Sequence, residues 1–189
     1  MTLPTANFSH QFLLAMPGML DPRFVETITY VLHHDDEGAV GLVINRPTEL
    51  TIQELLTEVA LPAQAPLRWP EARVLSGGPV AQHVGFVLHH QGGTWMSTRV
   101  LPDELYLTSS RDILQALAEG RGPDDYLVAL GYAGWGPGQL EQEIVQNAWL
   151  SCPVDQQILF HLPMEQRWQA AARSLGVDMR LLDVGVGHA

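Results

Sequence analysis

The chain has 189 residues, of which 46% are hydrophobic and 16% charged, so it carries enough apolar material for one globular domain spanning residues 1–189. Its formal net charge is −11 and its ten arginines are scattered along the chain, which argues against direct nucleic-acid binding. The chain has no lysine, which excludes lysine-dependent mechanisms such as Schiff-base chemistry. Because Cys152 is the single cysteine, an intramolecular disulfide is excluded. We find no signal peptide, and no apolar run approaches the roughly 20 residues that a membrane-spanning helix needs. We therefore expect an acidic, cytoplasmic protein with no membrane partner.

The N-terminal part of the chain is predicted to form strands. Residues 12–15 are a short apolar run that Pro17 ends. Residues 27–33 are rich in β-branched side chains, and residues 39–45 follow after an Asp-Asp-Glu-Gly turn, so the two segments predict a β-hairpin. Pro47 is expected to close the second strand, because proline cannot continue a β-ladder.

The middle of the chain alternates short strands with helices. Thr51 and Glu54 have the spacing of a capping box, and apolar residues follow at helical spacing, so we predict an amphipathic helix over residues 51–60. A second helix is expected to begin after a cap at Ser109 or Ser110. This second helix is expected over residues 111–119. Between the two helices we expect a proline-rich loop at residues 61–72 and strands at residues 73–75, 84–89 and within 95–108.

The C-terminal part begins with a near-continuous apolar run at residues 126–130, which predicts a central strand. A glycine-rich loop at residues 131–138 follows it. Because hairpins are mixed with strand–helix units, the order of elements predicts an α+β fold with a mixed sheet. Beyond the loop we expect a helix, a strand, a second helix and a loose tail, at residues 139–150, 158–160, 163–174 and 185–189.

The glycine-rich loop is the most unusual segment. A strand, a glycine-rich turn and a helix start can together bind a phosphate. However, no lysine is present to meet the charge, and Glu141 and Glu143 in the first turns of the helix would repel an anion. The alternative is a tight connection in which Tyr132 and Trp135 pack over the core. Gln139 lies one helical turn before Glu143, so these two side chains share a face and form a plausible polar anchor.

Two other segments are candidate anion sites. Arg46, at the expected end of a strand, can bind a carboxylate or phosphate with its fork of N–H groups, or it can pair with an acidic residue of the chain itself. Residues 76–79, with the sequence Ser-Gly-Gly-Pro, can form a backbone nest for an anion or a simple turn.

Catalytic and metal sites are poorly supported. One histidine from each of the pairs at residues 33–34 and 89–90 could join Asp35 or Asp36 around a transition metal, but the chain has no motif such as HExxH. It also has no GxSxG elbow, and Cys152 has no neighbouring histidine in the sequence, so we expect it to pack in the core. We therefore assign no catalytic residue, no metal ligand and no cofactor.

Several segments together resemble the YqgE/AlgH family of bacterial proteins. They are FLLAMPGMLDPRF, GAVGLVINRP, SGGPV, LGYAGWGPGQLEQEI with Trp149, and the late ILF and RW segments, and they span about residues 8–176. This resemblance implies an α+β fold with a mixed, bifurcated β-sheet curled into a pseudo-barrel with flanking helices. Some proteins of the family are labelled regulators of alginate synthesis or putative transcriptional regulators. The residues that match the family's motifs, and that we take as candidate binding residues, are Asn45, Arg46, Pro47, Gly77, Gly78, Pro79, Gly131, Tyr132, Gly134, Trp135, Gln139 and Glu143.

The sequence thus favours a non-enzymatic regulatory protein that binds a small ligand or a protein partner of unknown identity. If the glycine-rich and polar strand ends converge, Arg46, Tyr132, Trp135 and Gln139 would line a groove. Two alternatives stay open: a DNA-binding transcription regulator, as the family label implies, and a hydrolase that uses His33 or His34 with acidic neighbours.

Overall fold

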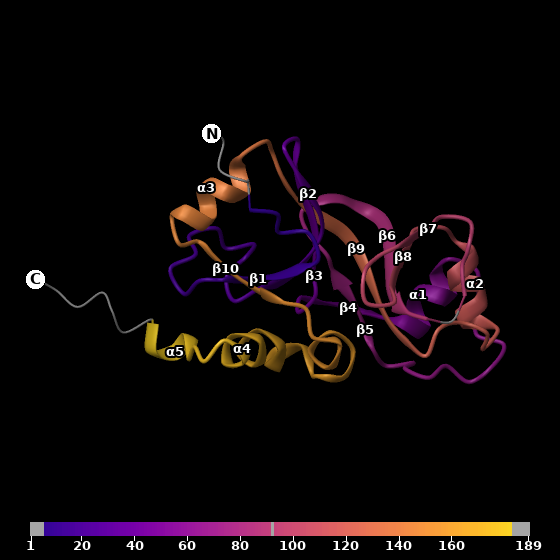
Figure 1. The fold of residues 1–189 in the computed structure, drawn as a ribbon. Helices are drawn as coiled ribbons and strands as arrows, with labels where there is room; N and C mark the ends of the chain where they lie inside the picture. Colours follow the sequence, from indigo (N-terminus) through magenta and orange to yellow (C-terminus); the bar gives the residue numbers. More distant parts are fainter. Residues whose placement is uncertain (1–5, 92, 183–189) are drawn as a thin grey trace, which may run out of the picture. The chain divides into compact units, whose positions relative to one another are not determined.

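Short segments rich in apolar and β-branched residues form the strands of this chain, several of them buried along nearly their whole length. The computed structural model describes residues 6–91 and 93–182, shown in Figure 1. The chain divides into two compact units, which are described separately below. Unit 1 comprises Met1–Asn45 and Ala133–Ala189, and unit 2 comprises Arg46–Tyr132.

Unit 1 is built on an antiparallel sheet in the order β10-β1-β2-β3-β9. Its strands are β1 (Gln11–Ala15), β2 (Ile28–Asp35), β3 (Gly38–Val43), β10 (Trp149–Pro153) and the last residues of β9 (Asp125–Trp135). The predicted hairpin of β2 and β3 is confirmed. Gly38 closes its turn with φ +132°, and a Cβ there would lie 2.2 Å from the Trp135 carbonyl oxygen, so this position requires glycine.

Helices lie on both sides of β1 and β10 in unit 1, as Figure 1 shows. On one side, Leu140 of α3 (Gln139–Val145) packs in a core with Leu13, Val31 and Trp149. On the other side lies α4 (Met164–Ser174), whose Trp168 indole N–H donates to the Ala15 carbonyl at 3.0 Å. The remaining helical elements are a π-helical turn, η1 (Gln157–His161), and α5 (Met179–Leu182).

Unit 2 contains a mixed sheet in the order β7-β8-β6-β9-β5-β4, curled around two helices. All pairs are antiparallel except the parallel pair of β5 and β9. Apolar residues of both helices, including Leu55, Leu56, Ile113 and Leu117, form the core with the sheet. The elements are β4 (Pro47–Thr51), α1 (Ile52–Glu58), β5 (Arg73–Ser76), β6 (Val80–His90), β7 (Thr98–Val100), β8 (Leu105–Thr108), α2 (Asp112–Ala118) and Asp125–Tyr132 of β9.

The predicted fold class, an α+β protein with a mixed, bifurcated and curled sheet, is confirmed. The bifurcation lies in β9, whose first part pairs with β5 and β6 in unit 2 and whose last three residues pair with β3 in unit 1. The capping box is also confirmed: the Thr51 hydroxyl accepts from the Glu54 N–H, and the Glu54 carboxylate accepts from the Thr51 N–H.

The strand before Pro47 ends as predicted, since β3 stops at Val43, but Pro47 also begins a strand that was not predicted, β4. This is possible because, among the described strands, β4 pairs with β5 alone and tolerates a missing N–H at its start. The predicted cap of α2 is wrong. Neither Ser109 nor Ser110 caps α2. Its N-cap is Arg111, whose side chain makes no capping hydrogen bond, and the Ser110 hydroxyl instead donates to Asp112.

The C-terminal part differs from the prediction at three places. The predicted glycine-rich loop is mostly strand, because β9 continues to Trp135 and only residues 136–138 remain as a turn. The helix predicted to reach residue 150 ends at Val145, since Asn147 takes a left-handed conformation with φ +58° and β10 follows. The run predicted as a strand at residues 158–160 forms η1, because three apolar residues do not distinguish a strand from a buried helical turn. The predicted tail at residues 185–189 lies outside the described residues.

Candidate functional site

The twelve candidate binding residues divide between the two units. Asn45, Gly134, Trp135, Gln139 and Glu143 belong to unit 1. Arg46, Pro47, Gly77, Gly78, Pro79, Gly131 and Tyr132 belong to unit 2. Their roles as binding residues stay a prediction, and the contacts within each unit are described next.

Glu143 is the centre of the polar cluster in unit 1. One carboxylate oxygen, Oε2, accepts the indole N–H of Trp135 at 2.9 Å and that of Trp149 at 2.7 Å. The other, Oε1, accepts from the Gln139 amide at 2.9 Å, while Gln139 Oε1 accepts the backbone N–H of Gly136 at 2.9 Å. The predicted proximity of Gln139 and Glu143 is therefore confirmed, and these hydrogen bonds fix the turn between β9 and α3.

The two tryptophans held by Glu143 are core residues. Trp135 is 6% exposed and Trp149 is 4% exposed, and their rings meet edge to face at a centroid distance of 5.8 Å. Phe24 contacts both rings. A buried indole N–H needs an acceptor, and the Glu143 carboxylate supplies it to both. These contacts support the alternative in which this segment serves packing and geometry.

Backbone groups of the Ser-Gly-Gly-Pro segment are engaged within unit 2. The Ser76 N–H donates to the Arg46 carbonyl and the Gly77 N–H to the Leu130 carbonyl, both at 2.8 Å, so two donors of the expected anion nest are already used. Gly131 has φ +74°, and a Cβ there would lie 2.5 Å from the Gly78 carbonyl oxygen. The glycines at this crossing thus allow two backbone segments to approach closely.

Asn45 acts as a structural bridge in unit 1. Its amide donates to the Glu26 carbonyl at 2.8 Å, and its oxygen accepts the Ile28 N–H at 3.0 Å. In unit 2, Pro47 lies opposite Leu75 in the β4–β5 pair, and the Tyr132 ring packs edge to face against Phe86.

Two histidines of unit 1, His33 and His34, are paired with carboxylates. His33 lies 2.7 Å from the Asp35 carboxylate at the surface, and this bond lowers the pKa of Asp35. His34 is buried, with Nδ1 accepting from the Phe8 N–H at 3.2 Å, so that Nε2 donates to Glu141 at 3.0 Å.

The histidines of unit 2 have different surroundings. His89 is fully buried and lies 2.9 Å from the Thr108 hydroxyl through Nε2 and 3.2 Å from the Gln91 carbonyl through Nδ1. Burial lowers its pKa, because a charged imidazole is poorly solvated there. His90 lies at 3.5 Å from Glu104. Among the described residues, no group of three or more His, Cys, Asp or Glu side chains is arranged to hold a metal ion.

Cys152 is buried in β10, and burial raises the pKa of its thiol to about 11. At neutral pH the side chain is therefore a thiol rather than the thiolate that a nucleophile requires. The expectation that Cys152 packs in the core is confirmed by its 3% exposure.

A cavity of about 210 Å³ lies in unit 2, where α1 and the start of α2 meet β6 and β9. Its apolar lining consists of Leu55, Val59, Phe86, Val87, Leu114, Val128 and Leu130, with Gly85 leaving space on β6. Its polar lining consists of His83, Thr108, Ser109, Ser110 and Arg111. An apolar hollow with a few polar groups on one part of its wall is the usual form of a small-molecule site.

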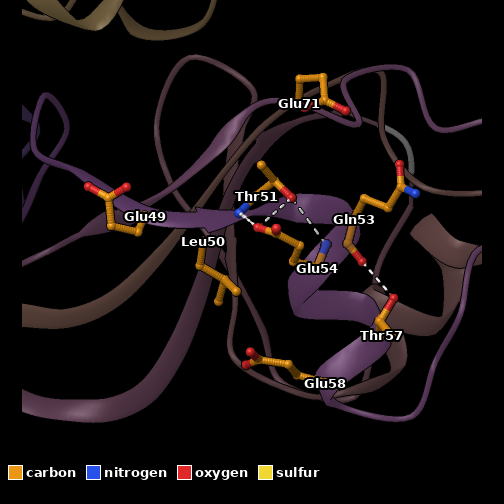
Figure 2. A pocket seen from close by; sticks show the side chains of 8 residues that line it. All are labelled: Glu49, Leu50, Thr51, Gln53, Glu54, Thr57, Glu58 and Glu71. Carbon is orange, nitrogen blue, oxygen red and sulfur yellow. Dashed lines mark hydrogen bonds between the residues drawn. The ribbon is translucent and has the colours of Figure 1, made fainter.

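A second, more open hollow lies beside α1 and is acidic. It is lined by four glutamates, of which Glu54 is engaged in the capping box with Thr51. Figure 2 shows that the carboxylates of Glu49, Glu58 and Glu71 lie around the hollow and do not converge on one point. Hydrogen bonds from the Thr51 N–H and hydroxyl lower the pKa of Glu54, so that this carboxylate stays ionised. The arrangement provides a negative surface next to the cavity wall rather than a set of ligands.

Sequence reasoning missed the residues that line the unit 2 cavity. His83, Gly85 and Arg111 were not among the predicted site residues. One signal was available, because an isolated glycine inside a predicted strand, such as Gly85 in residues 84–89, often marks the close approach of another group. Arg111 gave no such signal, since its place on the cavity wall depends on the packing of α2 against α1.

Comparisons with known proteins agree along nearly the whole chain. A family model described as AlgH-like matches residues 12–180. A UPF0301 protein of Thioalkalivibrio sulfidiphilus is 51% identical over 98% of both chains, and one of Azoarcus is 49% identical over the same shares. The solution structure of the AlgH protein from Pseudomonas aeruginosa, 48% identical, covers 100% of this chain and 99% of its own with a TM-score of 0.78. A Corynebacterium diphtheriae protein, only 17% identical, covers 97% of this chain and 95% of its own with a TM-score of 0.70 and shares the fold. Within the described residues, no helix is long and apolar enough to cross a membrane.

Proposed function

The chain belongs to the AlgH-like family, and we propose that it is a non-enzymatic regulatory protein of the cytoplasm that binds a small molecule in the unit 2 cavity. The observation that carries this proposal is the cavity itself, which combines an apolar interior with His83, Ser109 and Arg111 on its wall. Ligand occupancy would stabilise α1, α2 and the sheet against one another, and a change of this kind can be transmitted to a protein partner.

The contacts of the candidate catalytic groups support a protein without enzymatic activity. Cys152 is a buried thiol, and His34 and His89 are buried side chains whose ring nitrogens are engaged by other groups of the protein. His33 is exposed and paired with Asp35, but an acid–base pair needs a pocket that positions a substrate. Neither of the two cavities described above includes His33 in its lining.

The arginines provide little support for direct DNA binding. Arg23, Arg68, Arg121 and Arg180 lie against carboxylates of the chain itself, and Arg167 is buried. With a net charge of −11, the protein lacks the excess of free cations that phosphate neutralisation requires. Regulation by this protein is therefore better explained by a small ligand or a protein partner than by direct contact with DNA.

The test compares the wild-type chain with a variant whose cavity is filled. Gly85 is suited to this because its φ is not in the left-handed region and a Cβ there would meet only Leu130 Cδ2, at 3.8 Å. Gly85→Leu should therefore fold and occupy part of the cavity. The matched control is Gln82→Leu, which adds the same side chain to an exposed position of the same strand outside the cavity.

A thermal-shift screen with small metabolites should find ligands that raise the Tm of the wild-type and Gln82→Leu chains. At a hundred times its Kd, a ligand adds about 2.7 kcal/mol to the stability of the folded state. The same compounds should leave Gly85→Leu unshifted. Equal shifts in all three chains would exclude the cavity as the site, and no shift from any compound would favour a protein partner instead.

A further inference from the structure

We infer that the ligand of the unit 2 cavity is a small amphipathic monocarboxylate, with its carboxylate at Arg111 and its apolar chain against the residues of α1, α2 and β9. This inference rests on the function proposed above and specifies the chemistry of the same site. The size of the cavity sets the first limit. Its volume of about 210 Å³ lies below the roughly 300–1,000 Å³ of sites that enclose drug-sized ligands, so it suits a small molecule with a short chain.

The interior of the cavity favours an aliphatic chain. Leu55, Val87 and Val128 are buried beneath it, and Leu114 and Leu130 are half-buried at its sides. These side chains offer no hydrogen bond to a sugar or another polyol. A polar ligand would therefore lose its hydration without replacement, whereas a methylene chain would gain free energy from burial.

The polar groups on the wall are not equally available. The Thr108 hydroxyl is bonded to His89 and Thr98, and the Ser110 hydroxyl is bonded to Asp112 and the Ser97 N–H.

This leaves Arg111, Ser109 and His83 as groups that could receive a ligand's head group. Arg111 is positioned for this, because one of its N–H groups donates to the Val59 carbonyl at 2.5 Å and holds the guanidinium on the wall. A guanidinium has five N–H donors in a planar fork, so donors remain to bind a carboxylate.

The charge around the cavity favours a single negative charge on the ligand. Among the described residues that line the cavity, Arg111 is the one arginine. On the neighbouring face of α1, Glu54 and Glu58 line the acidic hollow. A phosphate or dicarboxylate would bring more negative charge than Arg111 balances beside these glutamates. A cationic head group would be repelled by Arg111, whereas a monocarboxylate would form charge-assisted hydrogen bonds with it.

The experiment uses hexanoate as the probe, with hexanol and hexylammonium as controls that share its chain but not its charge. Each is titrated into the full-length ¹⁵N-labelled chain and followed by backbone amide shifts. Hexanoate should perturb the amides of Gly85, Phe86 and Ser109 and bind at least tenfold more tightly than hexanol. Affinity should also rise about fourfold per methylene from butanoate to hexanoate.

Variants separate the two parts of the inference. Arg111→Gln should weaken hexanoate binding about tenfold or more while leaving hexanol binding unchanged. The control is Arg99→Gln, which changes an exposed arginine of β7 outside the cavity and should affect the binding of neither compound. Gly85→Leu should abolish binding of both. If hexanol binds as well as hexanoate, or if Arg111→Gln has no effect, the carboxylate assignment is wrong while the cavity remains a binding site. If no probe perturbs these amides, the assignment is also overturned, and the metabolite screen with Gly85→Leu then decides separately whether the cavity binds anything.

Discussion

Replacing Glu143 with alanine should strongly destabilise the protein, because one carboxylate satisfies two buried indole N–H groups. Trp135 and Trp149 are 6% and 4% exposed, and both donate to Glu143 Oε2. A buried donor left without an acceptor costs about 1–3 kcal/mol, so two such donors should lower the free energy of unfolding by about 2–6 kcal/mol. Gln139 is exposed, and its amide would regain water at little cost.

Urea denaturation followed by circular dichroism measures this loss. Glu143→Gln should cost less than Glu143→Ala, because an amide oxygen can still accept an indole N–H but without the assistance of a charge. Gln142→Ala is the matched control, since Gln142 is exposed on the same helix. Its effect should stay within about 0.5 kcal/mol.

A double-mutant cycle with Trp149→Phe isolates the hydrogen bond from the loss of packing. In the wild-type chain this substitution removes both the indole contacts and the bond to Glu143. In the Glu143→Ala chain the bond is already absent, so the same substitution should cost less, with a coupling energy of about 1–3 kcal/mol. If Glu143→Ala behaves like Gln142→Ala, or if the two changes are additive, the carboxylate does not support the tryptophans as argued.

Two further predictions concern backbone conformation and pH. Gly131→Ala should destabilise unit 2 by about 1–3 kcal/mol, because Gly131 has φ +74° and an added Cβ would meet the Gly78 carbonyl oxygen. The control is Gly18→Ala, which should have little effect in the same urea titration because a Cβ added there meets no atom within 4 Å. Burial lowers the pKa of His89 below its ordinary value of 6.5, so the unfolded chain binds this proton more tightly, and stability should fall as the pH drops through 6.5 towards the lowered pKa. Urea titrations at several pH values should show this fall in the wild-type chain and a smaller one in His89→Gln, and equal falls in both would assign the pH dependence to other groups.

Local signals account for the parts of the fold that the sequence predicted. The hairpin of β2 and β3 follows from β-branched residues on either side of a turn that ends in Gly38, and the start of α1 follows from Thr51 and Glu54. Both depend on residues within a few positions of one another. The capping box in particular is completed by hydrogen bonds over three residues, so no knowledge of the rest of the chain is needed to predict it.

Contacts between distant segments account for the parts that were missed. The glycines at the end of β9 have loop-like composition, yet residues 133–135 continue the strand because β3 supplies partners for them. Trp149 fits the period of the preceding helix but lies in β10, where it pairs with Ala15 of β1. The cavity of unit 2 was missed for the same reason, since Arg111 reaches its wall only through a bond to Val59, 52 positions away in the chain.

The segments that identify the family and the residues proposed to bind the ligand are different parts of the sequence. In the segment from Gly131 to Glu143, glycine permits a close backbone approach and the carboxylate supports two buried indoles, so the distinctive pattern is explained by the requirements of folding. His83, Ser109 and Arg111 lie outside all the segments on which the resemblance rests. A protein can therefore show the whole family pattern while its ligand is determined elsewhere, and substitutions at Glu143 and at Arg111 should separate these two roles: the first should lower stability, and the second should change affinity with stability largely retained.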